Sequence, residues 1–377
     1  DMFRIANQTG FVLNAKSNLS ASVYYQYADD WFAFPITISI PHSFNNDIGA
    51  TLYYHLSMSK MRLSAGVLST FGWMDRRYHI NKDGKASFMF ARDRLHAANF
   101  TVFTEADYAL HDQLHAVLDV HGVYNKRNSK DAFGDPSLRP WYSHMSKKYR
   151  YFYSQNSTLR QHFTAFNPRI GLIWSPVRRK DIQLFANVSN SYEPPTFDEL
   201  VGTEVTSNIN TSPKKLFSIA LKKQTATTFE LGSKGRLSRL SWNVAFYHSW
   251  VANEILEIKD YVRGQKRTEN YPNTVHQGLE VGIQMASKPR LFGYNIGSFT
   301  IGAVYDYSRF TFKGGKYDGK YLAGVPKHYI NTSLDYQHSC GLNGSISLEL
   351  KPGETPIDHT NTMFQPAYHV WNARLGY

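Results

Sequence analysis

The sequence predicts an all-β fold, a transmembrane antiparallel β-barrel, from three observations. Strand-like stretches are joined alternately by short turns and by long polar segments along the whole chain. Apolar and polar residues alternate within these stretches, and 15% of the residues are aromatic although the mean hydropathy is -0.43. No uninterrupted apolar run reaches the roughly 18 residues that a membrane-spanning helix needs. Barrel strands produce this combination, because only every second residue faces lipid and aromatic residues collect at the interfaces.

The predicted connections give the barrel an orientation, because outer-membrane barrels have short periplasmic turns and longer extracellular loops. The short connections fall at 16–18, 57–60, 111–113, 175–181, 235–239, 287–294 and 338–343. The long ones fall at about 30–47, 79–93, 126–161, 193–224, 259–275, 312–326 and 352–366. We therefore expect the first set on the periplasmic side and the second set outside the cell.

Alternation with a period of two is the main strand signal. Leu114, Ala116, Leu118 and Val120 alternate with His115, Asp119 and His121, and several later segments repeat the pattern. A soluble β-sandwich also alternates. A barrel is favoured because the strands reach about 10 residues, roughly twice the soluble average. Charged residues also stand in mid-strand, as a wet lumen permits; these are Asp119, Glu230, Glu280, Asp335 and Arg374.

The sequence contains about 15 predicted strands, with no repeat, low-complexity tract or linker that marks a second domain. Residues 1–377 are therefore expected to be one partial barrel domain. Single-chain bacterial barrels have an even number of strands, so the odd count indicates missing sequence.

Composition argues against several other functions. The net charge of +12 is spread over turns and loops instead of one patch, which disfavours nucleic acid as a partner. A single cysteine, Cys340, excludes an intrachain disulfide framework. No nucleophile elbow, phosphate-binding loop or zinc helix motif is present. The sequence therefore predicts neither an enzyme nor a bound cofactor.

Several segments resemble one family in order and spacing. They read NPRIGLIWSP at 167–176, SYEPPTFDEL at 191–200, QTATTFELGSKG at 224–235, HQGLEVG at 276–282, LAGVPKH at 322–328, DHTNT at 358–362 and NARLGY at 372–377. Together they resemble the C-terminal barrel half of TonB-dependent outer-membrane receptors, particularly the ferric-dicitrate-receptor-like branch. The resemblance implies a barrel of about 22 strands around a plugged lumen. It places roughly six strands before Asp1 and one or two after Tyr377, with the plug domain and the TonB box absent from these residues.

The resemblance implies a function in the bacterial outer membrane, the energy-coupled uptake of a ferric siderophore or ferric citrate-like chelate. Iron would be carried as the chelate substrate. The TonB–ExbB–ExbD complex would be a partner through the missing plug and TonB box, and the bilayer and lipopolysaccharide would surround the barrel. Two alternatives remain open: a passive porin-like or adhesin barrel without a plug, and a haem or free copper or zinc importer on the same scaffold.

A basic, aromatic segment between Lys126 and Tyr153 is the leading candidate for contact with the substrate. Arginine offers a fork of donors to carboxylate oxygens, and tyrosine and tryptophan offer flat area to a chelate. The predicted substrate-binding residues, including two from a second basic segment, are Arg139, Trp141, Tyr142, Tyr149, Arg150, Tyr151, Tyr153, Arg263 and Arg267. The alternative is that the cations face lipopolysaccharide phosphates and the aromatic residues form the outer girdle.

A second segment invites a ligand-site interpretation but favours a structural one. Its prolines, Pro194 and Pro195, can stop a strand at the outer rim, where Phe197 would pack. The carboxylates Glu193, Asp198 and Glu199 could coordinate a metal, but a solvated acidic loop is the favoured interpretation.

Overall fold

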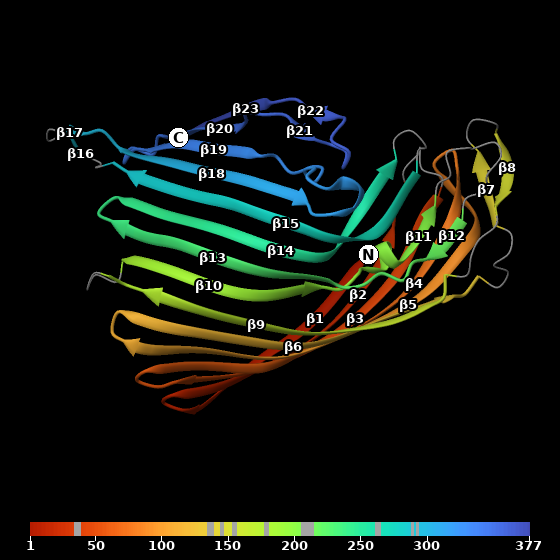
Figure 1. The fold of residues 1–377 in the computed structure, drawn as a ribbon, viewed down its shortest axis with the longest axis horizontal. Coiled ribbons are helices and arrows are strands. Elements are labelled where there is room, and N and C mark those ends of the chain that lie inside the picture. The colour runs from red at the N-terminus through yellow and green to blue at the C-terminus, as the bar shows by residue number, and fades with distance from the viewer. Residues whose placement is uncertain are drawn as a thin grey trace.

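The computed structural model describes residues 1–33, 39–133, 139–143, 147–152, 157–176, 181–204, 215–260, 265–287, 290–291 and 294–377. Fifteen strands form one antiparallel sheet in the order β1-β2-β3-β4-β5-β6-β9-β10-β13-β14-β15-β18-β19-β20-β23. Each strand of this sheet pairs with its neighbour in the chain order, so the topology is a continuous meander (Figure 1). The predicted strand count and the all-β class are confirmed.

The strands of the first half are long. They are β1 (Met2–Asn14), β2 (Ser17–Trp31), β3 (Ser39–Ser57), β4 (Met61–Lys82), β5 (Lys85–His111), β6 (Leu114–Asp131), β9 (Leu159–Trp174) and β10 (Ile182–Glu193). The second half contains β13 (Gln224–Leu237), β14 (Leu240–Asp260), β15 (Gln265–Ala286), β18 (Ser298–Phe312), β19 (His328–Gln337), β20 (Asn343–Lys351) and β23 (Tyr368–Gly376).

Short elements occupy the connections. The loop side has the hairpins β7 (Arg139–Ser143) with β8 (Lys148–Phe152), β11 (Val201–Glu204) with β12 (Lys215–Ser218), and β21 (Thr355–Pro356) with β22 (Phe364–Gln365). It also has the short helix α1 (Phe197–Leu200) and the 3₁₀ turn η1 (Gly315–Tyr317). On the turn side, β16 (Arg290–Leu291) pairs with β17 (Tyr294–Asn295).

Several predicted loops are in fact extensions of the strands. Residues 79–93 were expected to be a loop, but β4 and β5 continue through them and reverse at Asp83 and Gly84, where φ is 52° and 85°. Two consecutive positive φ angles are typical of the type I′ hairpin turn that Asp-Gly favours. Most of 30–47 and 259–275, and the first residues of 126–161, are likewise strand. The short turns lie where the sequence predicts them.

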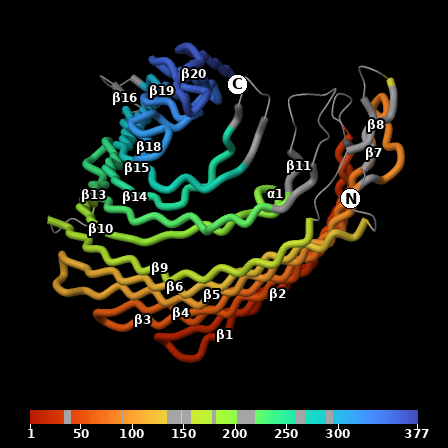
Figure 2. Tube along the Cα trace, turned by 45° about the vertical axis from the view of Figure 1, so that its right-hand side comes forward, coloured from red at the N-terminus to blue at the C-terminus, as the bar shows by residue number. Residues whose placement is uncertain are grey.

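The two faces of the curved sheet differ in polarity. One face exposes large apolar side chains, among them Leu118 (45% exposed) and Ile170 (64%). The other carries Asp119, Glu230 and Glu280, as alternation requires. Figure 2 shows α1 on the concave side of the sheet, where Asp198 contacts a polar-face residue of β4, Arg76. The polar face is therefore the inner, luminal one, and the apolar face is the outer one.

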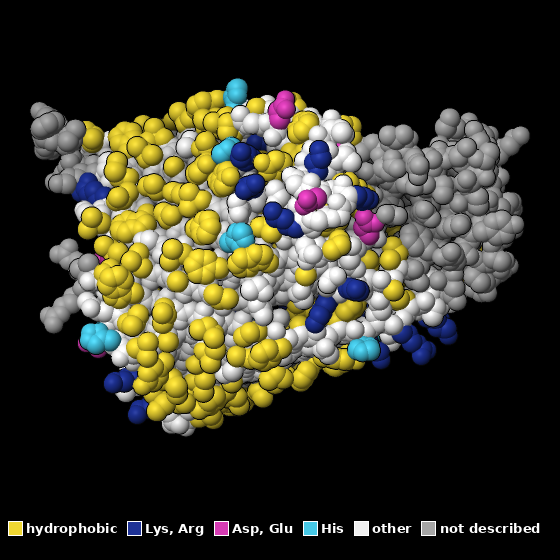
Figure 3. Space-filling view, in the orientation of Figure 1, with side chains coloured by type: hydrophobic (Ala, Val, Ile, Leu, Met, Phe, Trp, Pro, Cys, Tyr) yellow, Lys and Arg dark blue, Asp and Glu magenta, His cyan; other side chains and the backbone are white. Residues whose placement is uncertain are grey.

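The face seen in Figure 3 differs between its turn end and its loop end. In Figure 3 hydrophobic side chains cover the turn-side half of the visible face, and Lys and Arg side chains are more frequent toward the loop end. Within the described residues, no helix is both long and apolar enough to cross a membrane.

Buried apolar clusters lie at the loop end of the sheet. One consists of Leu200, Val201 and Leu221, with partly buried Leu159, Ile219 and Ile255 packed against it. The other consists of Ile258, Tyr271, Phe312, Tyr317 and Leu322. These clusters hold the long connecting segments against the loop end of the sheet, while the strand region leaves its outward apolar side chains exposed.

Candidate functional site

The luminal wall contains a row of charged residues on three neighbouring strands. Backbone register places Glu105 of β5 opposite Asp119 of β6, and Asp119 opposite Arg169 of β9. The Arg169 Nη1 atom lies 3.7 Å from the Asp119 Oδ2 atom. The row is therefore mixed in charge, and a water-filled lumen can solvate its members.

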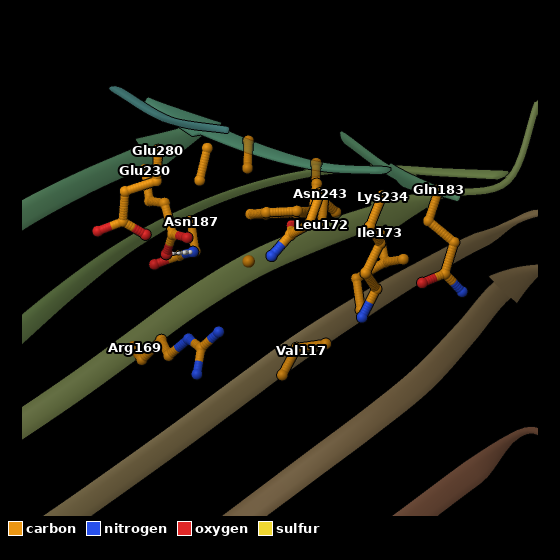
Figure 4. A pocket seen from close by; sticks show the side chains of 14 residues that line it. Val117, Arg169, Leu172, Ile173, Gln183, Asn187, Glu230, Lys234, Asn243 and Glu280 are labelled. Carbon is orange, nitrogen blue, oxygen red and sulfur yellow. Dashed lines mark hydrogen bonds between the residues drawn. The ribbon is translucent and has the colours of Figure 1, made fainter. Parts of the chain in front are cut away.

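A pocket of about 350 Å³ opens on this wall beside the row (Figure 4). Asn187 of β10 donates a hydrogen bond of 2.9 Å from Nδ2 to the Glu230 Oε2 atom of β13. Arg169 of β9 also lines the pocket, and Gln183, Lys234, Asn243 and Glu280 add further polar groups. These groups can hydrogen-bond water or a polar ligand. Among these groups the sequence predicted only Glu230 and Glu280 as luminal charges, because cross-strand register decides which side chains meet.

The segment after β10 folds inward across the mouth of the lumen. Thr196 and Glu199 form a capping box around α1, with the Thr196 amide 2.7 Å from the Glu199 Oε2 atom. Pro195 and Leu200 are fully buried. Strand β10 ends at Glu193, immediately before Pro194 and Pro195, and the capping box gives Glu199 a partner within the segment.

An ion-pair network holds this segment against β4 and β5. Arg76 donates a hydrogen bond of 2.7 Å from Nη1 to the Asp198 Oδ1 atom, and its Nη2 atom lies 3.8 Å from the Asp93 Oδ2 atom. Ser157 donates to the Asp93 Oδ1 atom at 2.6 Å. Arg76 also stacks on Tyr78, and burial raises the pKa of the Tyr78 phenol to about 12. The phenol is therefore neutral at physiological pH.

Two of the acidic residues considered as metal ligands thus have structural partners, Glu199 in the capping box and Asp198 in the ion pair with Arg76. In the described ranges, no group of three or more His, Cys, Asp or Glu side chains is arranged to hold a metal ion.

A second part of the mouth is built from the β18–β19 and β20–β23 connections. The Asn361 side chain pairs with the Tyr321 backbone through hydrogen bonds of 2.8 and 2.9 Å, and the Gly324 amide donates to the Pro356 carbonyl at 2.7 Å. His359 accepts a hydrogen bond from the Ala323 amide at 3.2 Å. The segments that contain the LAGVPKH and DHTNT motifs are therefore hydrogen-bonded to each other.

Asp358 organises the second of these motifs. Its carboxylate accepts hydrogen bonds from the Thr360 and Thr362 hydroxyls and from the Thr362 and Met363 amides, the amides at 2.9 and 2.8 Å. Burial alone would raise the pKa of Asp358, but these donors outweigh burial and lower the pKa to about 2. The carboxylate is therefore a fixed anchor of the loop.

Most of the predicted substrate-contact residues share one hairpin. In the β7–β8 register, Arg139 is opposite Phe152, Pro140 is opposite Tyr151, Trp141 is opposite Arg150, and Tyr142 is opposite Tyr149. An ion pair of 3.0 Å between Lys147 and Asp83 links this hairpin to the tip of the β4–β5 hairpin. Arg267 lies on a different hairpin, opposite Ile258 of β14. Tyr153 and Arg263 lie outside the described residues.

The cations of the basic segment divide between the two faces. Arg127 faces the lumen, where its Nη1 atom donates to the Asn99 Oδ1 atom at 2.8 Å. Its neighbours on β6, Lys126 and Lys130, are exposed on the outer face. The part of the predicted loop from 126 to 131 is therefore strand, and its lysines do not face the lumen.

Comparison with known proteins identifies the barrel. A family model described as "TonB dependent receptor-like, beta-barrel" matches residues 3–377. No curated protein has a matching sequence.

Solved structures share the fold. The ferric yersiniabactin uptake receptor FyuA from Yersinia pestis superposes with a TM-score of 0.67 at 12% identity, covering 100% of this chain and 54% of that one. The ferric citrate transporter FecA superposes with a TM-score of 0.69 at 14% identity, covering 99% and 53%. The copper transporter OprC superposes with a TM-score of 0.75 at 13% identity, covering 99% and 56%. The chain thus spans about half the length of these structures.

Proposed function

Because the chain belongs to the TonB-dependent receptor family and corresponds to the β-barrel of such receptors, we propose that it forms the transport barrel for a ferric siderophore or ferric citrate-like chelate. Proteins of this family lie in the bacterial outer membrane, and its solved members are transporters and receptors, not enzymes. The proposal concerns the substrate class and the coupling of transport to energy.

The observation that supports a ferric chelate is the β7–β8 hairpin. It concentrates Arg139, Trp141, Tyr142, Tyr149 and Arg150 within two short paired strands on the loop side of the barrel. Ferric chelates of citrate and of many siderophores carry negative charge and flat ligand groups. Guanidinium forks suit carboxylate oxygens, and aromatic side chains suit flat faces.

Transport would proceed in two stages under this proposal. The extracellular hairpins capture the chelate first, with the β7–β8 hairpin, which includes Tyr151, as the main contact. Arg267 lies on the separate β14–β15 hairpin, and Tyr153 and Arg263, which lie outside the described residues, remain candidates from the sequence. The chelate then passes the polar luminal wall, once a plug supplied outside these residues has been displaced by the TonB–ExbB–ExbD complex.

The test is uptake of radiolabelled iron by cells that express the complete gene, with and without functional TonB. Ferric citrate, a ferric catecholate, a ferric hydroxamate and haem are supplied separately, and copper and zinc ions are supplied without a chelator. We expect TonB-dependent accumulation of iron from one of the first three substrates.

Other results would reject the proposal in distinguishable ways. TonB-independent permeation of all substrates would establish a passive pore. TonB-dependent accumulation of haem, copper or zinc alone would keep the family but replace the substrate class.

A further inference from the structure

His359 lies where three connections on the loop side of the sheet meet. It belongs to the β20–β23 connection, and its imidazole packs against Phe312 at the end of β18 and against Tyr317 of η1, with ring centroids 5.2 and 6.0 Å apart. The Phe312 ring meets the imidazole edge to face, at an interplanar angle of 90°. A hydrogen bond to the Glu257 backbone joins the imidazole to β14 near its loop end. One titratable ring therefore contacts three connections.

Hydrogen bonding selects the neutral form of this ring. The Nδ1 atom of His359 accepts a hydrogen bond of 3.2 Å from the Ala323 amide. A nitrogen that accepts a hydrogen bond carries no proton, so the proton of the neutral ring lies on Nε2. An imidazolium has N–H donors at both nitrogens. Protonation would therefore point an N–H group at the Ala323 N–H and break this bond between the two connections.

The surroundings of the imidazole also favour its neutral form. The titratable and charged residues that face it are Glu254 of β14, Lys316 and Tyr317 of η1, and Asp358 beside it in the chain. Burial disfavours the imidazolium and lowers the pKa of His359 below its ordinary value of 6.5, and Lys316 acts in the same direction. The two carboxylates act in the opposite direction, but burial outweighs them.

Both carboxylates already have other donors. The Glu254 side chain accepts a hydrogen bond from the Thr274 hydroxyl, and its Oε1 atom lies 3.3 Å from the His276 Nε2 atom. Asp358 accepts hydrogen bonds from hydroxyls and amides of its own loop. These carboxylates are therefore engaged in fixed networks, and neither is positioned as a dedicated partner for a charged His359.

We propose that His359 is an acid-sensitive latch of the mouth, whose protonation loosens the docking of the 355–363 segment on the β18–β19 connection. Its contribution to docking is complete above about pH 6.5 and is lost as the pH falls through the lower pKa of the docked ring. Asp358 stays ionised in this range, because its pKa is about 2. The loop therefore keeps its internal hydrogen bonds while its docking weakens.

The latch is one of several contacts between the two segments. Two hydrogen bonds between the Asn361 side chain and the Tyr321 backbone, and one from the Gly324 amide to the Pro356 carbonyl, also join them. These groups do not titrate near neutral pH. Protonation of His359 therefore loosens the segment without releasing it completely, and this effect does not depend on which chelate the barrel carries.

The test measures amide hydrogen exchange by mass spectrometry in the receptor produced from its complete gene and purified in detergent. Protection factors, which correct for the intrinsic pH dependence of exchange, are recorded between about pH 8 and pH 5, the range in which imidazoles titrate. The segments 321–328 and 355–363 are compared with β20 as an internal reference. We expect protection of both segments to fall by about two- to tenfold as the pH is lowered, as loss of one hydrogen bond predicts, while β20 is unchanged.

The variant His359→Asn assigns the effect to the imidazole. The asparagine oxygen occupies the position of Nδ1 and accepts from the Ala323 amide, but it does not titrate. We expect the protection of both segments in this variant to be independent of pH across the range. The control is His111→Asn in the β5–β6 turn, where an exposed imidazole accepts from the Gln113 amide at 3.4 Å through the same atom, Nδ1. The control should keep the wild-type profile at the mouth.

Three results would each overturn the proposal. They are a wild-type profile without pH dependence, an equal pH dependence in His359→Asn, and loss of the pH dependence in the His111→Asn control. Folding of each variant is checked by the heat-dependent shift in electrophoretic mobility of the barrel. If His359→Asn does not fold, His359→Gln takes its place with the same expected profile, and the wild-type profile is a test that needs no variant.

Discussion

Arg76 of β4 and Asp198 of α1 are 122 residues apart in the chain and joined by a hydrogen bond of 2.7 Å across the mouth of the barrel. The two partners differ greatly in exposure, since the side chain of Arg76 is 9% exposed and that of Asp198 is 89% exposed. The buried Arg76 also faces the buried Asp93. The same ion pair therefore has a buried end and a solvated end.

Substitution of Arg76 and substitution of Asp198 should lower the free energy of unfolding by different amounts. Arg76→Gln removes the charge that faces buried Asp93, and we expect a loss of about 3 kcal/mol in the free energy of unfolding. Asp198→Asn removes only an exposed partner, and we expect a loss below about 1 kcal/mol. Urea unfolding in detergent micelles measures both values.

A matched control for Arg76 is Arg62→Gln, because Arg62 pairs with Asp107 but its side chain is 64% exposed. Its effect should resemble that of Asp198→Asn. Equal destabilisation by Arg76→Gln and Arg62→Gln would show that the Arg76 network does not anchor the mouth segment.

Asp358 makes the docking of the 355–365 segment sensitive to acid. Its folded-state pKa of about 2 lies below the ordinary value of 3.8, so its stabilising contribution is complete above about pH 4. The contribution is lost as the pH falls toward 2, when the carboxylate accepts a proton. We expect the hydrogen-exchange protection factors of the Thr362 and Met363 amides to fall across this window, relative to amides within β20.

The variant Asp358→Asn checks the origin of that titration. Its amide nitrogen cannot accept hydrogen bonds from the loop donors, so protection at neutral pH should drop by about 1 to 3 kcal/mol. In this variant the protection factors of the Thr362 and Met363 amides should also no longer depend on pH between 4 and 2. A pH profile like that of the wild type would assign the titration to another group.

Gly232 on the luminal face is required by close packing. A Cβ atom there would fall on the Phe185 ring and 2.5 Å from the Val244 carbonyl oxygen, which belongs to the backbone and cannot move aside. We expect Gly232→Ala to destabilise the barrel by about 1 to 3 kcal/mol. The control is Gly282→Ala, also luminal, where the nearest atom is 3.8 Å away. Urea unfolding of both variants should separate them, and equal stability would contradict the packing argument.

Substrate capture by the β7–β8 hairpin gives a prediction about affinity. The variant Arg139→Ala/Arg150→Ala should weaken binding of the anionic chelate by about tenfold or more, because each arginine contributes a charged hydrogen bond. The control Lys16→Ala/Arg236→Ala removes two cations from the turn side and should bind normally. The affinity of each purified variant is measured by titration with the chelate that the uptake experiment identifies. Equal affinities would show that the β7–β8 hairpin does not bind the chelate.

The sequence predicted the barrel and its turns because lipid contact imposes a strict pattern. Leu114 to Val120 alternate apolar and polar residues since one face meets lipid and the other meets water. That pattern ends where the strand leaves the membrane. Residues 79–93 were therefore predicted to be a loop, although Asp83-Gly84 is a hairpin signal that could have located the turn of the β4–β5 extension.

The candidate sites were less predictable. The Pro-Pro segment was expected to stop a strand, but the contact of Asp198 with Arg76 depends on α1 lying against β4 on the concave side of the sheet, which the sequence does not reveal. Lys126 and Arg127 are adjacent in a basic segment, yet they lie on opposite faces of β6. Composition cannot separate them, because the strand register alone decides which one faces water inside the barrel.

The sequence by itself determined the class of fold, the places of its short turns and its family, because alternation, turn spacing and motif order are local and are repeated along the chain. Only the tertiary structure decided which charges meet. Arg76 with Asp198, Asn187 with Glu230, and Arg94 with Lys130 are brought together by register and curvature, which arise when the strands pair.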